Sequence, residues 1–321
     1  MSDSHGHCDA FLPIIGILCV DIAQPLQNLH GNEVHSYLAA SYVKYLETAG
    51  AKVIPIWNNS PRVYYEEIMN KINGILLPGG AIYFNKKYCK KELTNDSYSS
   101  AQHIYDIAVQ LNRKGKYFPL WGTCLGFQLM LTHSAGVEDV RQDCQPMNCS
   151  RAIKFEDEKV LQQSKLFANI SQDMREKMSQ QPFGFHFHKY CITKQRLEMF
   201  KIAKLWRVLA TNEDENGLEF ISIVEHKEFP FFGAQFHPER VMFEHMGPQD
   251  HCHHCISCFK LNQYFARFFV DQCSKSDNRF ANYDDELRHS IYNFPSIYTA
   301  PLKLHWQHCF LFKADVDYKS N

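Results

Sequence analysis

Cys124 is the residue of this chain best suited to nucleophilic chemistry. It lies between Gly122 and Gly126 in the stretch PLWGTCLGFQL (119–129), where apolar residues precede and follow the glycines. The pattern predicts a strand that turns sharply into a helix at the cysteine. Because the first amides of a helix carry partial positive charge, they favour a thiolate there. We expect a nucleophile at Cys124 and an oxyanion donor in the amide of Leu125, against the alternative of a buried structural cysteine.

A thiol nucleophile needs an imidazole that takes up and returns its proton, and the segment FFGAQFHPE (231–239) offers one. His237 and Glu239 lie two residues apart after a strand-like alternation, so both side chains project to the same side of an extended chain. This spacing lets a carboxylate orient an imidazole, and Pro238 stiffens the backbone between them. Since the chain has 17 histidines, a surface turn remains the alternative.

A second oxyanion donor is expected from another loop at the carboxyl edge of the same sheet. The run NGILLPGG (73–80) predicts a buried strand that ends in a glycine turn, where a backbone amide can approach a substrate closely. We assign this donor to Gly80, with an ordinary strand-ending turn as the alternative.

The elements that must position these residues alternate between strand and helix in the first half of the chain. Strands are predicted at 13–20, 51–57, 73–80 and 117–123, and helices at 34–49, 63–72, 99–113 and 125–136. This order predicts an α/β fold with a parallel sheet and helices on both faces. Short strands then follow at 185–193, 207–213, 218–227 and 231–239, with a helix at 259–271. We expect a catalytic α/β domain over residues 1–271 and a C-terminal extension, 272–321, packed on the same domain.

Composition excludes some classes of function. Of the 321 residues, 45% are hydrophobic and 21% charged, and the formal net charge of −1 gives no basic surface for nucleic acid. No apolar run is long enough for a membrane span. The apolar segment 11–20 lacks a basic start, so we read it as a buried strand, and no signal peptide is visible. Twelve cysteines show no tidy pairing.

Three motifs occur in an order that resembles the class I glutamine amidotransferase-like superfamily. They are P-G-G after a strand, G-x-C-x-G at the turn into a helix, and H-P-E late in the chain. Within that superfamily the chain resembles the gamma-glutamyl hydrolase family over nearly its whole length. The segments that carry this likeness include PIIGIL, INGILLPGG, YFPLWGTCLGF, FHKY and SIYT. The resemblance implies a flavodoxin-like, three-layer sandwich around a mostly parallel central sheet.

The resemblance also implies a reaction and roles for individual residues. The reaction is hydrolysis of γ-linked amide bonds in folate and antifolate poly-γ-glutamates, through a γ-glutamyl thioester and without a metal or organic cofactor. By similarity, Cys124 is the nucleophile, His237 the base, Glu239 its orienting carboxylate, and Gly80 and Leu125 the oxyanion donors. A further active-site histidine corresponds to His188, which can contact a substrate carboxylate or aid protonation of the leaving group.

Substrate binding is expected to involve cations, because poly-γ-glutamate is a polyanion. Lys189 and Arg240 flank the active-site segments, and solvated surface charges are the alternative. Gln128 lies where many gamma-glutamyl hydrolases have Glu, whereas glutamine amidotransferases usually have Gln there to bind free glutamine. Gln128 therefore supports a second hypothesis, that the chain is a glutaminase acting with a separate synthase partner. Against it, the chain carries no synthase module. An inactive binding protein is a third, which the intact catalytic motifs disfavour.

The last expectations concern metals and location. The segment HCHHCISC (251–258) is predicted to be a surface loop and not a zinc site, because no second ligand cluster accompanies it. The resemblance implies a possible homodimer, which is common in the family, and a location in lysosomes, vacuoles or the cell exterior, which family members usually reach. Four N-x-S glycosylation sequons weakly favour the secretory route, at Asn58, Asn95, Asn148 and Asn169.

Overall fold

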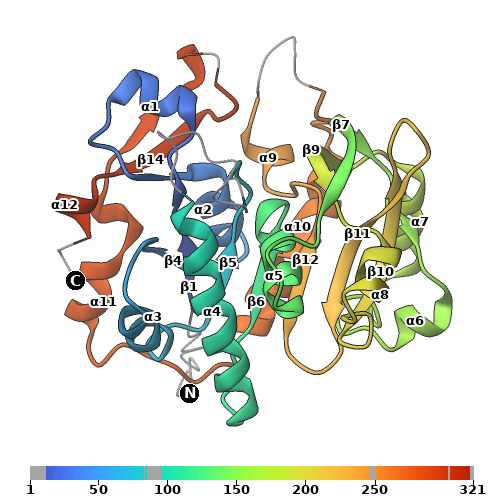
Figure 1. Cartoon of the computed structure of the whole chain (residues 1–321), viewed down its shortest axis with the longest axis horizontal. Coiled ribbons are helices and arrows are strands. Elements are labelled where there is room, and N and C mark those ends of the chain that lie inside the picture. The colour runs from blue at the N-terminus through green and yellow to red at the C-terminus, as the bar shows by residue number, and fades with distance from the viewer. Residues whose placement is uncertain (1–11, 83, 85–94, 246–250, 303, 319–321) are drawn as a thin grey trace, which may run out of the picture.

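An eight-stranded sheet forms the centre of the computed structural model, which describes residues 12–82, 84, 95–245, 251–302 and 304–318 (Figure 1). Five strands lie parallel to their neighbours, in the order β4 (Lys52–Ile56), β1 (Ile14–Leu18), β5 (Gly74–Leu77), β6 (Leu120–Thr123) and β12 (Phe231–Ala234). The antiparallel strands β11 (Glu219–His226), β10 (Trp206–Glu213) and β8 (Lys154–Phe155) continue the sheet. The buried parallel strands are apolar on both faces, as helix-covered strands must be.

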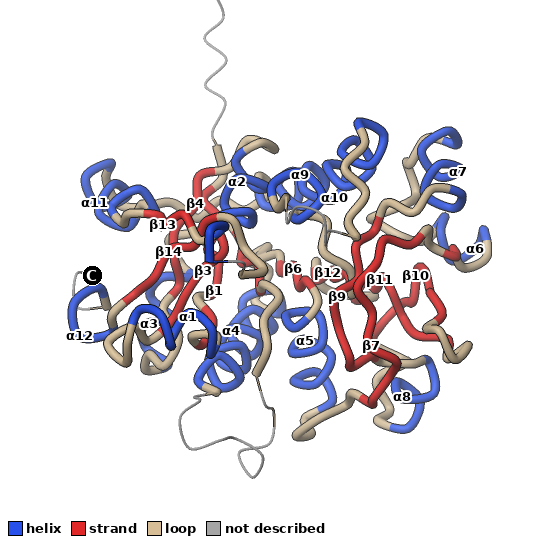
Figure 2. The backbone as a smooth tube through the Cα atoms, turned by 90° about the horizontal axis from the view of Figure 1, so that it is seen from above, coloured by secondary structure: helices blue, strands red, loops and turns tan. Residues whose placement is uncertain are grey.

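Helices cover both faces of the central sheet (Figure 2). On β1, Ile15 and Ile17 pack in the core shared with α2 (Ala40–Glu47) and α10 (Ile256–Cys273). Ile14 and Leu18 point the other way, into the core shared with three further helices. These are α3 (Arg62–Met69), α4 (Asp96–Arg113) and α5 (Leu125–Ala135). The three-layer α/β fold predicted from the sequence is therefore confirmed.

Two smaller sheets flank the central one. The antiparallel pair β7 (Gln142–Arg151) and β9 (Gly184–Cys191) lies beside the carboxyl edge of the parallel strands (Figure 2). A four-stranded sheet has the order β13 (Ser296–Tyr298), β14 (His308–Phe312), β3 (Ser36–Ala39) and β2 (Val20–Asp21). Its two halves come from opposite ends of the chain, so the C-terminal extension pairs directly with the N-terminal segment.

Short helices complete the described part of the chain. They are α1 (Gln24–His30), α6 (Glu158–Gln162), α7 (Gln172–Gln180), α8 (Lys194–Met199), α9 (Arg240–Phe243), α11 (Tyr283–His289) and α12 (Ala314–Asp317), with the 3₁₀ helices η3 (Ile291–Asn293) and η4 (Ala300–Leu302). Among the described helices, none is long and apolar enough to cross a membrane.

The predicted helix at 34–49 is wrong in its first half. Residues Ser36–Ala39 form β3, and the helix begins only at Ala40. The reason is a partner remote in sequence, because β14 pairs with one side of β3 and β2 with the other. The predicted first strand, 13–20, is likewise split, since Val20 and Asp21 leave the central sheet to form β2.

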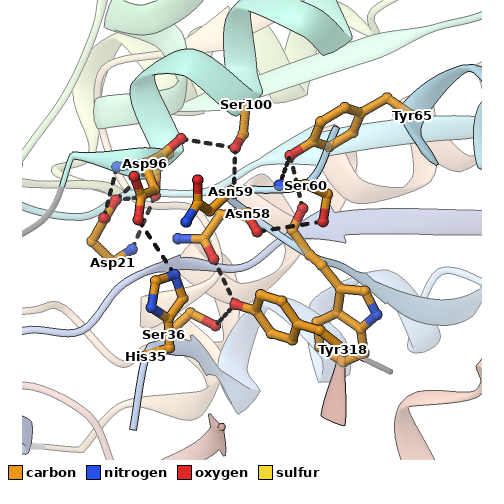
Figure 3. Close-up of polar contacts among 12 residues, drawn as sticks. Asp21, His35, Ser36, Asn58, Asn59, Ser60, Tyr65, Asp96, Ser100 and Tyr318 are labelled. Carbon is orange, nitrogen blue, oxygen red and sulfur yellow. Dashed lines mark hydrogen bonds and ion pairs between the residues drawn. The ribbon is translucent and has the colours of Figure 1, made fainter. Parts of the chain in front are cut away.

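A hydrogen-bonded cluster joins Tyr318, directly after α12, to the first half of the fold (Figure 3). The Tyr318 hydroxyl lies 2.6 Å from Ser36 Oγ and donates to Asn58 Oδ1 at 2.5 Å. In the same cluster, the Asp21 carboxylate accepts hydrogen bonds from the amides of Asp96 and Ser97, at 2.8 and 2.9 Å, and so caps α4 from another element.

The four sequons differ in exposure. Asn58 and Asn95 are buried, whereas Asn148 and Asn169 are exposed. In the folded chain only the latter two asparagines are accessible for glycosylation, which stays a prediction for them.

Candidate active site

Three loops leave the carboxyl edge of the sheet side by side, because β5, β6 and β12 are parallel neighbours. Leu77 of β5 is in register with Gly122, and Ala234 of β12 with Thr123. The glycine turn, the cysteine and the H-P-E segment each follow one of these strands. This edge is where open α/β sheets bind ligands, so adjacent strands assemble the three motifs without any long excursion of the chain.

Cys124 occupies a strained backbone conformation between β6 and α5. Its φ is +51° and its ψ −103°, a region that residues with a side chain rarely adopt. Hydrogen bonds hold the turn: the amide of Cys124 donates to Ala234 O at 2.8 Å, and that of Gly126 donates to Pro78 O at 3.0 Å. The strain turns the thiol out of the strand and toward the cavity described below.

Close packing explains the glycines on either side of the cysteine. A Cβ at Gly122 would lie 2.6 Å from the amide nitrogen of Phe127, and one at Gly126 would overlap the backbone carbonyl of Leu77. Both obstacles are backbone atoms, which cannot turn aside as a side chain can. The G-x-C-x-G pattern is thus required by the approach of α5 to β5 and β6.

His237 and Glu239 form a buried pair in which His237 Nδ1 lies 2.7 Å from Glu239 Oε1. Burial alone would lower the pKa of the imidazole, but attraction to Glu239 and to Cys124 outweighs burial and raises that pKa to about 9. Glu239 occupies Nδ1, which leaves Nε2 for the thiol. The site therefore favours a protonated His237 beside Cys124 at neutral pH.

Tyr42 of α2, which sequence reasoning missed, connects two of the three loops. Its hydroxyl accepts a hydrogen bond from the amide of Gly79 at 2.7 Å and lies 3.3 Å from His237 Nδ1. The amide of Gly79 is therefore occupied. Among the described residues, no backbone hydrogen bond outside helices and strands uses the amide of Gly80 or Leu125, and Leu125, as the first residue of α5, has no acceptor in its own helix.

A cavity of about 960 Å³ lies over this edge of the sheet. All nine residues predicted for the site line it: Cys124, His237, Glu239, His188, Gly80, Leu125, Gln128, Lys189 and Arg240. The lining also includes Arg141 and, from the C-terminal extension, His305 and Trp306. These three were missed because no local motif marks them, and only the folded chain brings them to the cavity.

His188 lies on β9 with both ring nitrogens directed at protein groups. Its Nε2 is 3.0 Å from His186 Nδ1, and its Nδ1 is 3.7 Å from Cys144 Sγ. Burial and the nearby His237 lower the pKa of His188 to about 3, so the ring is neutral at physiological pH. It therefore supplies no fixed positive charge to a substrate carboxylate. The adjacent Phe187 carbonyl lies 3.9 Å from Cys124 Sγ.

The two predicted cations differ in their surroundings. Lys189 is exposed, and its ammonium lies 5.2 Å from the centre of the Tyr190 ring. Arg240 is buried, and its Nη2 donates to His305 O at 2.7 Å. The expectation of a solvated surface charge thus fits Lys189 but not Arg240, whose guanidinium holds the C-terminal extension against the cavity.

Gln128 is buried, and its amide is engaged by the protein. Its Nε2 donates to Tyr190 O and to Gln235 Oε1, both at 3.0 Å, while its Oε1 accepts from Arg141 Nη1 at 3.4 Å. Arg141 is also bonded to both carboxylate oxygens of Asp139, each at 2.9 Å. Gln128 thus positions Arg141 at the cavity wall.

The segment 251–258 is only partly the surface loop that was predicted. His251 and Cys255 are exposed, but Cys252 and Cys258 are buried, and α10 begins at Ile256. A helix start explains the difference, because Cys255 caps α10 and turns Cys258 inward. Among the described residues, no group of three or more side chains is arranged to hold a metal ion.

Comparisons with known proteins agree with this arrangement. The family model for peptidase C26 matches residues 13–239, from the first central strand through Glu239. Gamma-glutamyl hydrolase of Homo sapiens is 32% identical over 97% of this chain and 93% of its own length. Gamma-glutamyl hydrolase B of Dictyostelium discoideum is 31% identical over 96% of this chain and 85% of its own length. Gamma-glutamyl hydrolase 1 of Arabidopsis thaliana is 29% identical over 90% of this chain and 79% of its own length. The chain therefore belongs to the peptidase C26 family, in which these gamma-glutamyl hydrolases are its relatives.

Proposed function

We propose that this chain hydrolyses γ-glutamyl amide bonds of folate and antifolate poly-γ-glutamates through a thioester on Cys124. The relatives' shared name, gamma-glutamyl hydrolase, supports the reaction class. One observation carries the mechanism: a cysteine on a strained turn shares the cavity with an imidazole whose Nδ1 lies 2.7 Å from a buried carboxylate, and attraction to both groups raises the pKa of that imidazole. That is the arrangement a thiol nucleophile needs.

In the first step, the Cys124 thiolate attacks the γ-carbonyl carbon of a glutamyl residue. The amides of Gly80 and Leu125 donate hydrogen bonds to the oxyanion that forms. Protonated His237 then gives its proton to the α-amine nitrogen of the next glutamate as the C–N bond breaks. The products are a shortened amine and a γ-glutamyl thioester on Cys124.

In the second step, neutral His237 takes a proton from water, which attacks the thioester carbon. The C–S bond breaks, the γ-carboxylic acid leaves, and the thiolate is restored beside protonated His237. Glu239 keeps Nδ1 occupied throughout, so the proton is exchanged at Nε2. Each step uses only side chains and amides of this chain.

The cavity is large enough for more than one glutamyl unit, since its volume of about 960 Å³ lies at the upper end of small-molecule sites. Lys189 is the exposed cation of its lining and is the candidate contact for substrate carboxylates. A homodimer and a lysosomal, vacuolar or extracellular location are inferred from the family alone.

Incubation with folate pentaglutamate and, separately, with free glutamine tests the proposal. The wild-type chain should shorten the pentaglutamate, and Cys124→Ala should lose this activity by about 10³-fold or more while keeping the wild-type circular dichroism spectrum. Cys149→Ala is the matched control, because Cys149 lies on β7 outside the cavity lining and should retain activity. Retained turnover in Cys124→Ala would falsify the nucleophile, and ammonia release from glutamine without chain shortening would favour a glutaminase.

A further inference from the structure

Two cysteines outside the cavity lie in contact at the start of α10. The Sγ atoms of Cys255 and Cys258 are 2.7 Å apart, and the amide of Cys258 donates to Cys255 Sγ at 3.2 Å. Cys255 is exposed, whereas the side chain of Cys258 is buried in the core under α10. The sequence C-I-S-C thus places one accessible and one protected thiol side by side.

The surroundings of the two thiols differ in a way that separates their chemistry. Although partial burial raises the pKa of Cys255, hydrogen bonds from the Cys258 thiol and from backbone amides of the first turn lower it overall. Burial, followed by the neighbouring Cys255, raises the pKa of Cys258 to about 12. Cys255 is therefore the more acidic thiol of the pair, and Cys258 the less acidic one.

We propose that Cys255 and Cys258 form a thiol–disulfide exchange site that reacts with low-molecular-weight disulfides. The Cys255 thiolate attacks one sulfur of the incoming disulfide, forms a mixed disulfide and expels one thiolate. Cys258 then loses its proton to solvent and attacks Cys255 Sγ, which expels the second thiolate. The chain gains one internal disulfide, and the external disulfide is reduced to two thiols.

This site is separate from the catalytic cavity, since neither cysteine contributes to its lining. Its approach is open to solvent: His253 is exposed, and the side chain of Ile256 is 72% exposed. The segment is nevertheless anchored, because the amide of His253 donates to Ser150 Oγ at 3.1 Å and His254 Nδ1 lies 2.7 Å from Val241 O. The two sulfurs are thus held together on an accessible, fixed helix start.

Oxidation with glutathione disulfide tests the exchange site in full-length Cys124→Ala protein, in which the nucleophile of the proposed hydrolase cannot react. Peptide mass spectrometry should find an internal disulfide between Cys255 and Cys258 and no lasting glutathione adduct. In Cys258→Ser the glutathione adduct should persist on Cys255, because the resolving thiol is gone. In Cys255→Ser neither product should form at this site, and the helix cap survives because serine is a good N-cap residue.

Alkylation of the reduced protein gives a second test that needs no variant at the pair. At pH 7, iodoacetamide should modify Cys255 about tenfold faster than Cys149, a partly buried cysteine of strand β7. The rate at Cys255 should reach half of its maximum below the pH at which an ordinary cysteine thiol ionises. Equal alkylation rates for the two cysteines, or a glutathione adduct on Cys255 that never resolves in the presence of Cys258, would overturn the proposal.

Discussion

The protonation of His237 depends on Glu239, whose carboxylate is 2.7 Å from Nδ1. Glu239→Gln keeps the shape and removes the charge, so the lowering effect of burial is less opposed, and the pKa of His237 falls below its present value of about 9. The protonated ring is present below that pKa and lost above it. We expect the alkaline limb of kcat/KM to move to lower pH and kcat at pH 7 to fall by about 10²-fold.

The pH–rate profile and an NMR titration of the His237 ring measure this effect. Glu244→Gln is the matched control, because Glu244 is also buried but bonds the amide of Gln307 and lies outside the cavity lining. Its profile should resemble that of the wild type. An alkaline limb that stays in place in Glu239→Gln would show that another group sets it.

Lys189 should influence substrate affinity but not the chemical step. Lys189→Glu places a negative charge at the open side of the cavity, where it repels the carboxylates of a poly-γ-glutamate chain. We expect KM for the pentaglutamate to rise roughly fivefold at low ionic strength, and less in high salt, with kcat unchanged. Lys204→Glu, an exposed lysine outside the cavity lining, is the control. An unchanged KM for Lys189→Glu would remove Lys189 from the binding site.

Residues with a local motif could be predicted from the sequence, whereas those placed by tertiary contacts could not. Cys124 and His237 each follow a strand, and each lies in a short motif, G-x-C-x-G or H-P-E, that indicates its role. Tyr42 lies on a helix with ordinary apolar spacing, and only the fold brings its hydroxyl to Gly79. Arg141 likewise is held at the cavity wall by contacts that only the fold creates, with Gln128, Asp139 and the ring of Phe84.

At the scale of elements, the position of α5 depends on two glycines. Gly126→Ala would drive a Cβ into the backbone carbonyl of Leu77, and strand and helix would have to separate. We expect a loss of about 3 kcal/mol or more in the free energy of unfolding, together with loss of activity, because the elbow at Cys124 would move. Urea denaturation and the pentaglutamate assay measure the two effects.

Gly136 provides the comparison on the same helix. It lies at the C-terminal cap of α5 with φ +63°, and no heavy atom of the described residues lies within 4 Å of the position that an added Cβ would take. Gly136→Ala therefore incurs only the cost of the left-handed conformation, about 1 kcal/mol. Activity should remain. If Gly126→Ala were no more harmful than Gly136→Ala, close helix–sheet contact would not be the reason for the glycine.

Local periodicity predicted the central α/β elements correctly because their buried apolar strands and one-sided helices leave a pattern in the sequence itself. It failed at Ser36–Ala39, where buried Tyr37, Leu38 and Ala39 fit a helix face as well as a strand. What decides between the two is pairing with β14, about 270 residues later. Short strands with remote partners leave no periodic signal of their own.

At the scale of the whole molecule, the C-terminal extension should unfold together with the α/β domain. It supplies β14 to the strand β3, and His305 and Trp306 to the cavity. The Phe312 side chain is fully buried, with its ring 5.0 Å from that of Trp57 and 5.3 Å from that of Phe294. A single hydrophobic core thus includes both parts of the chain.

Phe312→Ala tests whether the extension and the α/β domain unfold together, because it removes a large side chain from the core that they share. We expect the free energy of unfolding to fall by about 3–5 kcal/mol in one cooperative transition, seen at the same urea concentration by tryptophan fluorescence and by circular dichroism. Leu302→Ala, at an exposed residue of the extension, should change stability by about 0.5 kcal/mol or less. Phe312→Ala could instead produce a separate unfolding transition at low urea concentration and leave the main transition unchanged. The extension would then be a folding unit of its own, and its residues at the cavity would have to dock after the α/β domain had formed.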